Sequence, residues 1–159
     1  MSDAFFRAGV GAAVFDETHQ LLVLRRKTTP GEAWQLPQGG IGFAETPLDA
    51  LYRELREETG LEGSHVEVVA LAKDWWLYEL PVEFRNAKVG WGQAQRWYLC
   101  RLLAPRHAVR PDQIEFAEAK WVSPEQLLAH AVAFRVPIYR RLLAEFASYL
   151  QPVGSTEGT

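Results

Sequence analysis

The chain has 159 residues, a length that suits one domain with its own hydrophobic core. It has 17 Lys and Arg against 20 Asp and Glu, a net charge of −3, which argues against a broad basic surface for nucleic acid and leaves phosphate recognition to a local or metal-bridged site. The single cysteine excludes an internal disulfide, and the sequence contains no signal peptide or membrane-spanning apolar run, so we expect a cytoplasmic protein with no membrane partner.

Taken in chain order, the residue patterns predict an α/β fold. Strands are expected at residues 7–15, 21–24, 66–71, 92–102 and 121–123, where β-branched, aromatic and small apolar residues lie between polar turns. Helices are expected at residues 47–59, 124–130 and 138–150. Residues 1–150 are expected to form one domain and residues 151–159 a disordered tail. Cys100, in an expected strand, is predicted to be a buried small side chain rather than a nucleophile.

The helix at residues 47–59 has clear start and stop signals. Thr46 can cap the first free amides, Pro47 suits the first helical position, and Asp49 completes a pair that resembles a capping box. Gly60 marks the end, because glycine adopts the left-handed cap without a Cβ penalty.

This helix has two different faces. One face is apolar and is expected to pack on a sheet: Leu48, Leu51, Tyr52 and Leu55. Glu54, Glu57 and Glu58 converge on another face, where they repel one another unless a cation neutralises them, and hard divalent cations prefer such oxygen ligands. Three glutamates alone would more often be a solvated acidic face.

The stretch from residue 39 to residue 61 resembles the Nudix box. The family pattern is a glycine, five residues, Glu, seven residues, then Arg-Glu-aliphatic-x-Glu-Glu-x-Gly-aliphatic. It is filled here at every fixed position, by Gly39, Glu45, Arg53, Glu54, Leu55, Glu57, Glu58, Gly60 and Leu61. The segments Trp-Gln-Leu-Pro-Gln-Gly-Gly at 34–40 and Gly-Gln-Ala-Gln-Arg-Trp at 92–97 further resemble the Nudix branch of bacterial RNA pyrophosphohydrolases and dinucleoside polyphosphate hydrolases.

The resemblance implies an α/β/α sandwich, with a mixed sheet between helices, and a metal-dependent active site. It implies that Glu54, Glu57, Glu58 and a backbone carbonyl at Gln38 or Gly39 bind two or three Mg²⁺ or Mn²⁺ ions. Glu58 or Glu54 would take the proton from the attacking water, and the sequence leaves the choice open. Arg53 would orient the box glutamates.

Glu45, Gly39 and Gly40 would support the loop before the helix. A further metal ligand is expected at Glu115, which matches the family motif in register, with Glu118 as the competing candidate. Either could instead be a surface acid.

Substrate contacts are implied at Arg7, Phe134 and Arg135. A core Phe and a helix-start Arg are equally good interpretations of Phe134 and Arg135. The basic run at residues 25–27 is interpreted as a strand edge in preference to a phosphate contact.

The expected reaction is hydrolysis of a pyrophosphate bond in a nucleotide. The segment around Trp121 departs from the branch pattern, so dinucleoside polyphosphates such as diadenosine tetraphosphate are placed first. The 5′-triphosphate end of RNA is second, and an ordinary or oxidised nucleoside triphosphate is third. A non-catalytic nucleotide-binding module is the alternative of another class, although such a module would be expected to lack box glutamates. A homodimer is possible.

Overall fold

A mixed β-sheet forms the middle layer of the protein. The computed structural model describes residues 4–27 and 33–150, so the expected tail at 151–159 lies outside the described residues. At the centre, β1 (Phe6–Phe15) runs parallel to β7 (Gly92–Leu102) along its whole length. The other strands are β2 (Leu21–Arg26), β3 (Trp34–Gln35), β4 (Gln38–Gly40), β5 (Val66–Leu71), β6 (Trp76–Glu79) and β8 (Phe116–Val122).

The remaining strand pairs are antiparallel. The strand order is β3-β2-β1-β7-β5, with β4 also paired to β1, β6 to β7 and β8 to β2. The pairing of β1 with β4 places Gly9 opposite Gly40 and Val10 opposite Gly39. This pairing brings the glycine loop against the middle of the sheet.

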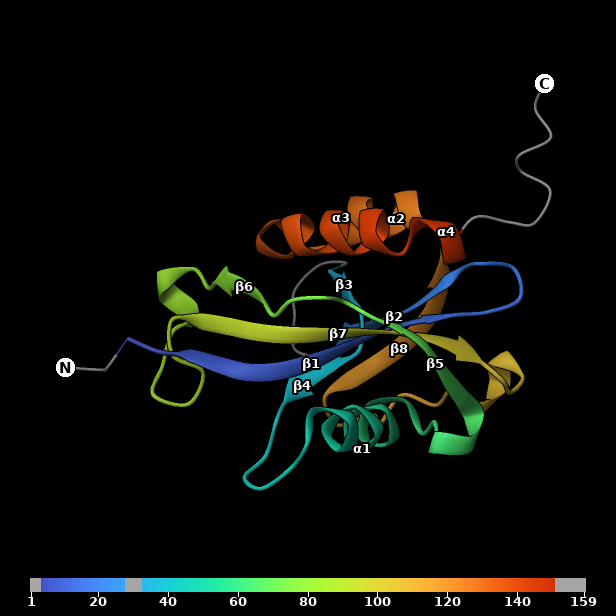
Figure 1. The fold of residues 1–159 in the computed structure, drawn as a ribbon, viewed down its shortest axis with the longest axis horizontal. Coiled ribbons are helices and arrows are strands. Elements are labelled where there is room, and N and C mark those ends of the chain that lie inside the picture. The colour runs from blue at the N-terminus through green and yellow to red at the C-terminus, as the bar shows by residue number, and fades with distance from the viewer. Residues whose placement is uncertain (1–3, 28–32, 151–159) are drawn as a thin grey trace.

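Helices cover both faces of the sheet. In Figure 1, α1 (Pro47–Thr59) lies on one face, and α2 (Pro124–His130), α3 (Val136–Glu145) and α4 (Ala147–Leu150) lie on the other. Short 3₁₀ turns are η1 (Gly63–His65), η2 (Val82–Phe84), η3 (Arg106–Ala108) and η4 (Ala133–Arg135). The predicted α/β/α sandwich is confirmed. Within the described residues, no helix has the length and apolar character needed to span a bilayer.

The alternation of side chains along β1 and β7 creates two cores. Trp97 and Leu99 face the layer of α3, where they belong to one cluster with Tyr139. Tyr98 and Cys100 face α1 and belong to a second cluster. The prediction of a buried Cys100 is confirmed, and burial raises the pKa of its thiol to about 12, so it remains protonated and unreactive at neutral pH.

Three local predictions need correction. The expected helix at 138–150 is two helices separated by Phe146, whose backbone leaves helical geometry (φ −101°, ψ 15°) while its side chain is buried. Leu48 is 41% exposed rather than packed on the sheet, since Ala50, Leu51 and Leu55 fill the contact. At the start of α1, the Thr46 hydroxyl accepts the Asp49 amide at 3.1 Å, which is one half of the expected capping pair.

Candidate active site

Local sequence fixes the helix that carries the candidate acids. Thr46 caps α1, Pro47 begins it, and Gly60 ends it in the left-handed conformation at φ 74°. Burial of Leu51 and Leu55 against the sheet orients the helix, so that the Glu54 and Glu58 side chains turn inward. Glu58 is only 3% exposed. A carboxyl group this deeply buried is unusual without a partner or a ligand.

The glycine loop lies directly against these two carboxyl groups. A Cβ atom added to Gly39 would lie 2.0 Å from the Glu54 carboxyl carbon, so no other residue fits there without displacing Glu54. The Gln38 backbone amide donates a 3.3 Å hydrogen bond to Oε2 of Glu58. The loop backbone and the helix carboxylates therefore form one compact group, which the spacing of the motif alone does not reveal.

Arg53 binds several members of this group at once. Its Nε and Nη2 donate to the two Glu45 oxygens at 2.7 and 3.0 Å. Its Nη1 donates to Glu54 at 2.9 Å and to Glu57 at 3.2 Å, and its Nη2 also reaches the Gly40 carbonyl oxygen at 2.8 Å. The planar guanidinium has the donor geometry for such a bidentate and branched arrangement. Arg53 thus connects helix and loop and has no direct place for a substrate phosphate.

Glu45 holds the loop from the other side. Its Oε1 accepts the Gly42 amide at 2.8 Å in addition to the Arg53 bonds. The hydrogen bond from Arg53, supported by that from the Gly42 amide, lowers the pKa of Glu45 to about 2. Glu45 is therefore anionic throughout the physiological pH range, and its two oxygens hold the Gly42 amide and the Arg53 guanidinium in place.

Glu54 and Glu58 have the opposite electrostatic character. Burial, followed by the negative charge of Glu54, raises the pKa of Glu58 well above its ordinary value of 4.5. Burial also raises the pKa of Glu54, although its contacts with Glu58 and Arg53 oppose that effect. Two carboxyl groups that are buried together in this way favour binding of a proton or a cation.

Glu115 acts electrostatically on Glu58 from another part of the chain. It follows η3 and precedes β8, and its charge contributes to the raised pKa of Glu58. The Asp112 side chain fixes this turn by accepting the backbone amide of Glu115 at 3.0 Å and those of the two neighbouring residues. Glu118 instead forms an ion pair with Arg25 at the sheet edge. Of the two candidates, Glu115 is therefore the one whose charge acts on Glu58, while Glu118 is paired with Arg25.

The carboxylate and carbonyl oxygens of this site are of the kind that binds a hard divalent cation, but the acidic side chains do not converge on one point. Across residues 4–27 and 33–150, no three His, Cys, Asp or Glu side chains converge closely enough to hold a metal ion. Glu57 is turned toward Arg53, and Glu115 lies 3.9 Å from Arg26. We give more weight to the buried carboxyl pair, in which Arg53 contacts Glu54 but no cation contacts Glu58 within the described residues, since carboxylate and carbonyl oxygens are the ligands that Mg²⁺ and Mn²⁺ prefer.

The three expected substrate contacts lie on the opposite side of the glycine loop from Glu54. The Arg7 guanidinium packs over Gly40, where an added Cβ would lie 2.1 Å from its Nη2. Phe134 is half-buried in η4 and stacks on Tyr78 with ring centroids 5.8 Å apart. The Arg135 guanidinium lies 5.0 Å from the Phe134 ring centroid, and its Nε is buried with no hydrogen-bond partner within the described residues.

Sequence reasoning missed the polar side chains that join these two regions. Gln38 contacts the Tyr78 hydroxyl at 3.5 Å through its side chain, while its backbone amide binds Glu58. The side-chain oxygens of Gln38 and Gln95 are buried and lack a hydrogen-bond partner in the part of the chain that is described. The alternation of Gln93 and Gln95 along β7 was the available signal, because it places both on one face of the sheet.

The basic run at residues 25–27 forms the end of β2 and the residue after it; β2 pairs there with both β3 and β8, so the expected strand edge is not found. Arg25 pairs with Glu118, Arg26 approaches Glu115, and the Lys27 ammonium donates to the Gln113 carbonyl oxygen at 2.7 Å. Glu118 and Glu115 thus offset the positive charges of Arg25 and Arg26 locally.

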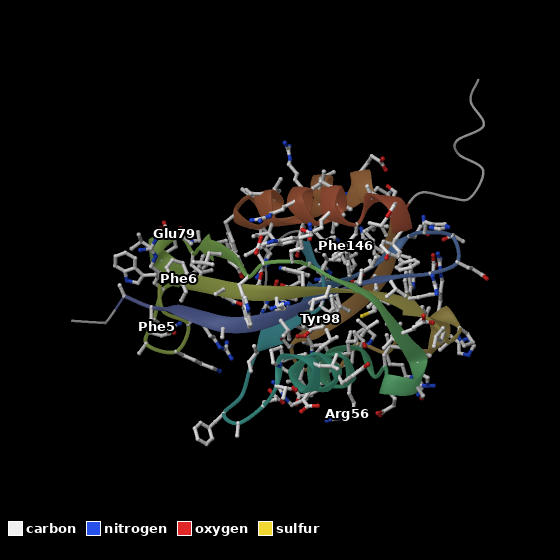
Figure 2. All side chains as sticks on the ribbon, in the orientation of Figure 1. Phe5, Phe6, Arg56, Glu79, Tyr98 and Phe146 are labelled. Atoms are coloured by element: carbon white, nitrogen blue, oxygen red, sulfur yellow. The ribbon has the colours of Figure 1, made fainter. Side chains whose placement is uncertain are left out.

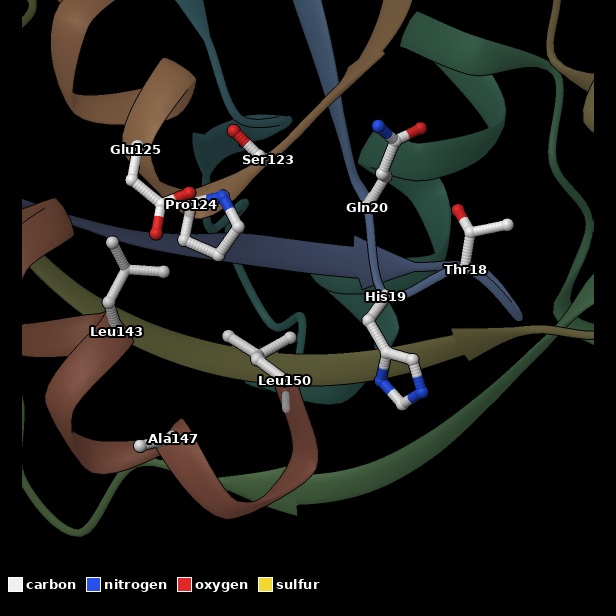
Figure 3. Close-up of a pocket in the computed structure, with 9 residues that line it drawn as sticks. All are labelled: Thr18, His19, Gln20, Ser123, Pro124, Glu125, Leu143, Ala147 and Leu150. Atoms are coloured by element: carbon white, nitrogen blue, oxygen red, sulfur yellow. The ribbon is translucent and has the colours of Figure 1, made fainter. Parts of the chain in front are cut away.

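A hollow of about 480 Å³ lies elsewhere, between the β1–β2 turn, the start of α2, and α3 with α4 (Figure 3). Its lining includes His19, Ser123 and Leu150, and none of the candidate site residues contributes to it. It has one carboxylate, Glu125, and no cluster of acids. The glutamates of α1 are therefore a better candidate for the active site than this hollow.

Comparison with known proteins agrees with this architecture. The NUDIX domain family profile matches residues 5–145. The chain belongs to the Nudix hydrolase family. Nudix relatives include proteins named RNA pyrophosphohydrolase from Pseudomonas putida F1, 43% identical, and from Pseudomonas aeruginosa LESB58, 42% identical; each alignment covers 91% of this chain and 94% of the relative.

Solved Nudix structures share the fold. A Caenorhabditis elegans Ap4A hydrolase complex has a TM-score of 0.69 at 20% identity, covering 89% of this chain and 98% of that one. The Escherichia coli dihydroneopterin triphosphate pyrophosphohydrolase has a TM-score of 0.73 at 17% identity, covering 90% and 99%. At these identities the likeness establishes the fold alone.

Proposed function

We propose that this Nudix hydrolase cleaves a pyrophosphate bond at the 5′-triphosphate end of RNA. The observation that carries the substrate assignment is the 42–43% identity, over about nine-tenths of both chains, to proteins named RNA pyrophosphohydrolase. The sequence patterns placed dinucleoside polyphosphates first, and this identity now moves RNA ahead of them. We also propose that residues 1–150 act as a single catalytic domain.

The carboxylates of the site require a cation to receive such a polyanion. We propose that Glu54, Glu57, Glu58, Glu115 and the Gly39 carbonyl hold two or three Mg²⁺ or Mn²⁺ ions. When bound, these ions neutralise the phosphate oxygens and lower the pKa of a coordinated water. The buried pair and the backbone of the loop that contacts it support this assignment.

The side chains of the protein then have separate roles. Glu54 or Glu58 accepts the proton of the attacking water, and both lie in the buried group where a proton is held above the ordinary glutamate pKa. Arg53 and Glu45 keep the loop and helix in register through their paired hydrogen bonds. Arg7 and Arg135 supply positive charge on the substrate side of the loop.

A turnover panel with Mg²⁺ and with Mn²⁺ tests the proposal. It compares 5′-triphosphate RNA, diadenosine tetraphosphate, GTP and 8-oxo-GTP at matched concentration, with identification of the products. We expect the highest kcat/KM for 5′-triphosphate RNA, which should be converted to 5′-monophosphate RNA. A preference for diadenosine tetraphosphate would replace the substrate assignment, and no turnover of any substrate would refute catalysis.

Glu57→Gln tests the metal assignment separately. This change should raise the Mg²⁺ concentration needed for half-maximal turnover, because a carboxylate ligand is replaced by an amide. Glu67→Gln is the matched control, since Glu67 is a comparably exposed acid that pairs with Arg101 on β7, away from the site. If Glu57→Gln behaves like the control, Glu57 is not a ligand.

A further inference from the structure

An exposed aromatic ring stands beside Phe134 and has no role in the site described above. Phe84 is the last residue of η2, and 55% of its surface is exposed. Its ring centroid lies 6.3 Å from that of Phe134, with the ring planes tilted by 48°. The two rings thus form a continuous aromatic surface, although they come from segments fifty residues apart in the sequence.

The Phe134 ring offers little free surface to a ligand. Tyr78 stacks on it with an interplanar angle of 28°, the Arg135 guanidinium lies over it, and Phe134 is packed against the larger hydrophobic core. Phe84, in contrast, packs with one aromatic ring among the described residues and is itself exposed. Of these rings, Phe84 has the largest exposed fraction for stacking.

The turn that carries Phe84 is well held, so the exposure of the ring is built into the fold. The Phe84 amide donates to the Pro81 carbonyl oxygen at 2.9 Å. The next residue, Arg85, donates from Nε to the Leu80 carbonyl oxygen at 2.8 Å, and its guanidinium lies 4.9 Å from the Trp91 ring centroid. These bonds hold the exposed Phe84 ring beside Phe134, where it can stack on a ligand without a rearrangement of the turn.

The charges around this ring favour a nucleotide base as that ligand. The Arg135 guanidinium lies 5.0 Å from the Phe134 ring centroid, and the Arg7 guanidinium packs over Gly40 in the glycine loop. Next to the Phe84 ring itself, the exposed Glu83 disfavours phosphate. Figure 2 shows Glu79, the last residue of β6, at the same end of the sheet as Phe5 and Phe6. η2, which carries Phe84, follows β6 in the chain.

We propose that Phe84 stacks a base of the RNA downstream of its 5′ end, with Phe134 as the support behind it. This inference rests on the proposed function, since it names a contact to the same substrate. Aromatic rings bordered by basic side chains are the usual surface for single-stranded nucleic acid, and stacking tolerates any base because every base has a π face. The contact adds affinity for the RNA chain and leaves the reacting phosphates to the glutamate group.

Phe84→Leu tests the proposal, because leucine keeps apolar contact with Phe134 but removes the ring. KM for 5′-triphosphate RNA should rise about 5- to 100-fold with kcat little changed. Phe84→Trp should retain the wild-type KM. Leu103→Ala is the control: Leu103 is 56% exposed, close to the 55% of Phe84, and lies after β7 at the other end of the sheet. Thermal unfolding of each variant excludes a general loss of structure.

Modified RNAs identify the contact directly. An abasic residue placed in turn at the second, third and fourth nucleotides should abolish the difference between wild type and Phe84→Leu at one position. At that position, 2-aminopurine fluorescence should be quenched on binding to wild type and less so on binding to Phe84→Leu, in the absence of metal and turnover.

The outcomes separate this inference from the proposed function. Equal KM and equal quenching for wild type and Phe84→Leu, while RNA is hydrolysed, would overturn the role of Phe84. Ring-dependent quenching without hydrolysis of RNA by the wild type would support the stacking contact and refute the proposed reaction.

Discussion

Replacing Glu58 by glutamine should stabilise the metal-free protein while abolishing its function. Glutamine has nearly the same shape and can still accept the Gln38 amide, which lies 3.3 Å from Glu58 Oε2. It cannot ionise, so it removes the cost of a buried charge that only a bound cation would offset. Stabilisation of the metal-free state and loss of activity are expected together.

The expected magnitude follows from the raised pKa of Glu58. The ordinary pKa of a glutamate is 4.5, so the unfolded chain releases the Glu58 proton as the pH rises above that value. The folded protein keeps this proton to a higher pH, because the pKa of Glu58 is raised. The stabilisation due to this proton is therefore complete below pH 4.5 and is lost as the pH rises through the raised pKa. Within that window, wild-type stability should fall relative to Glu58→Gln by up to about 1.4 kcal/mol per pH unit.

Urea unfolding at a series of pH values in EDTA measures this difference. The lowered pKa of Asp16, where the hydrogen bonds from Thr18 and Arg106 outweigh the effect of burial, affects both proteins alike and cancels. Mg²⁺ should then stabilise the wild type more than Glu58→Gln. Parallel stability curves for the two proteins from pH 4 to pH 8 would refute the reasoning, because they would mean that Glu58 ionises in the fold as readily as in the unfolded chain.

Three further changes test the rest of the site. Arg53→Lys should lower kcat/KM about 10- to 100-fold, because lysine cannot bind three acids and the loop carbonyl together; activity at saturating Mg²⁺ measures this. Gly39→Ala should lower kcat about 100-fold, since its Cβ would lie 2.0 Å from the Glu54 carboxyl carbon and must displace that group; steady-state kinetics measure the loss. Tyr139→Phe should reduce stability by about 1–3 kcal/mol, because the Leu36 amide loses its buried acceptor at 3.0 Å; urea unfolding measures it.

Each of these changes has a control or a contrary result. Gly63→Ala is matched to the Gly39 variant, since the nearest atom to its added Cβ is at 3.7 Å, an ordinary contact, and it should keep full activity. Wild-type activity in Arg53→Lys would mean that the arginine contacts in the structure do not position the acids. An unchanged unfolding midpoint in Tyr139→Phe would mean that the Leu36 amide finds another partner.

The sequence by itself determined the features that depend on neighbouring residues. The bounds of α1 were predictable from Thr46, Pro47 and Gly60, because capping and the left-handed conformation are local effects. β5 and β7 were likewise predictable, since their patterns of apolar residues persist over whole strands. The family resemblance of the glutamate motif was also contained within one continuous stretch.

Only the tertiary structure decided the features that depend on distant contacts. The pairing of β2 with β8 brings Glu115 toward Glu58 and occupies Glu118 with Arg25. Packing of the last helices buries Phe146 and divides the expected helix there. The approach of η2 to η4 places the exposed Phe84 ring on Phe134. Such contacts join residues far apart in the chain, and hydrophobic periodicity gives no register between them.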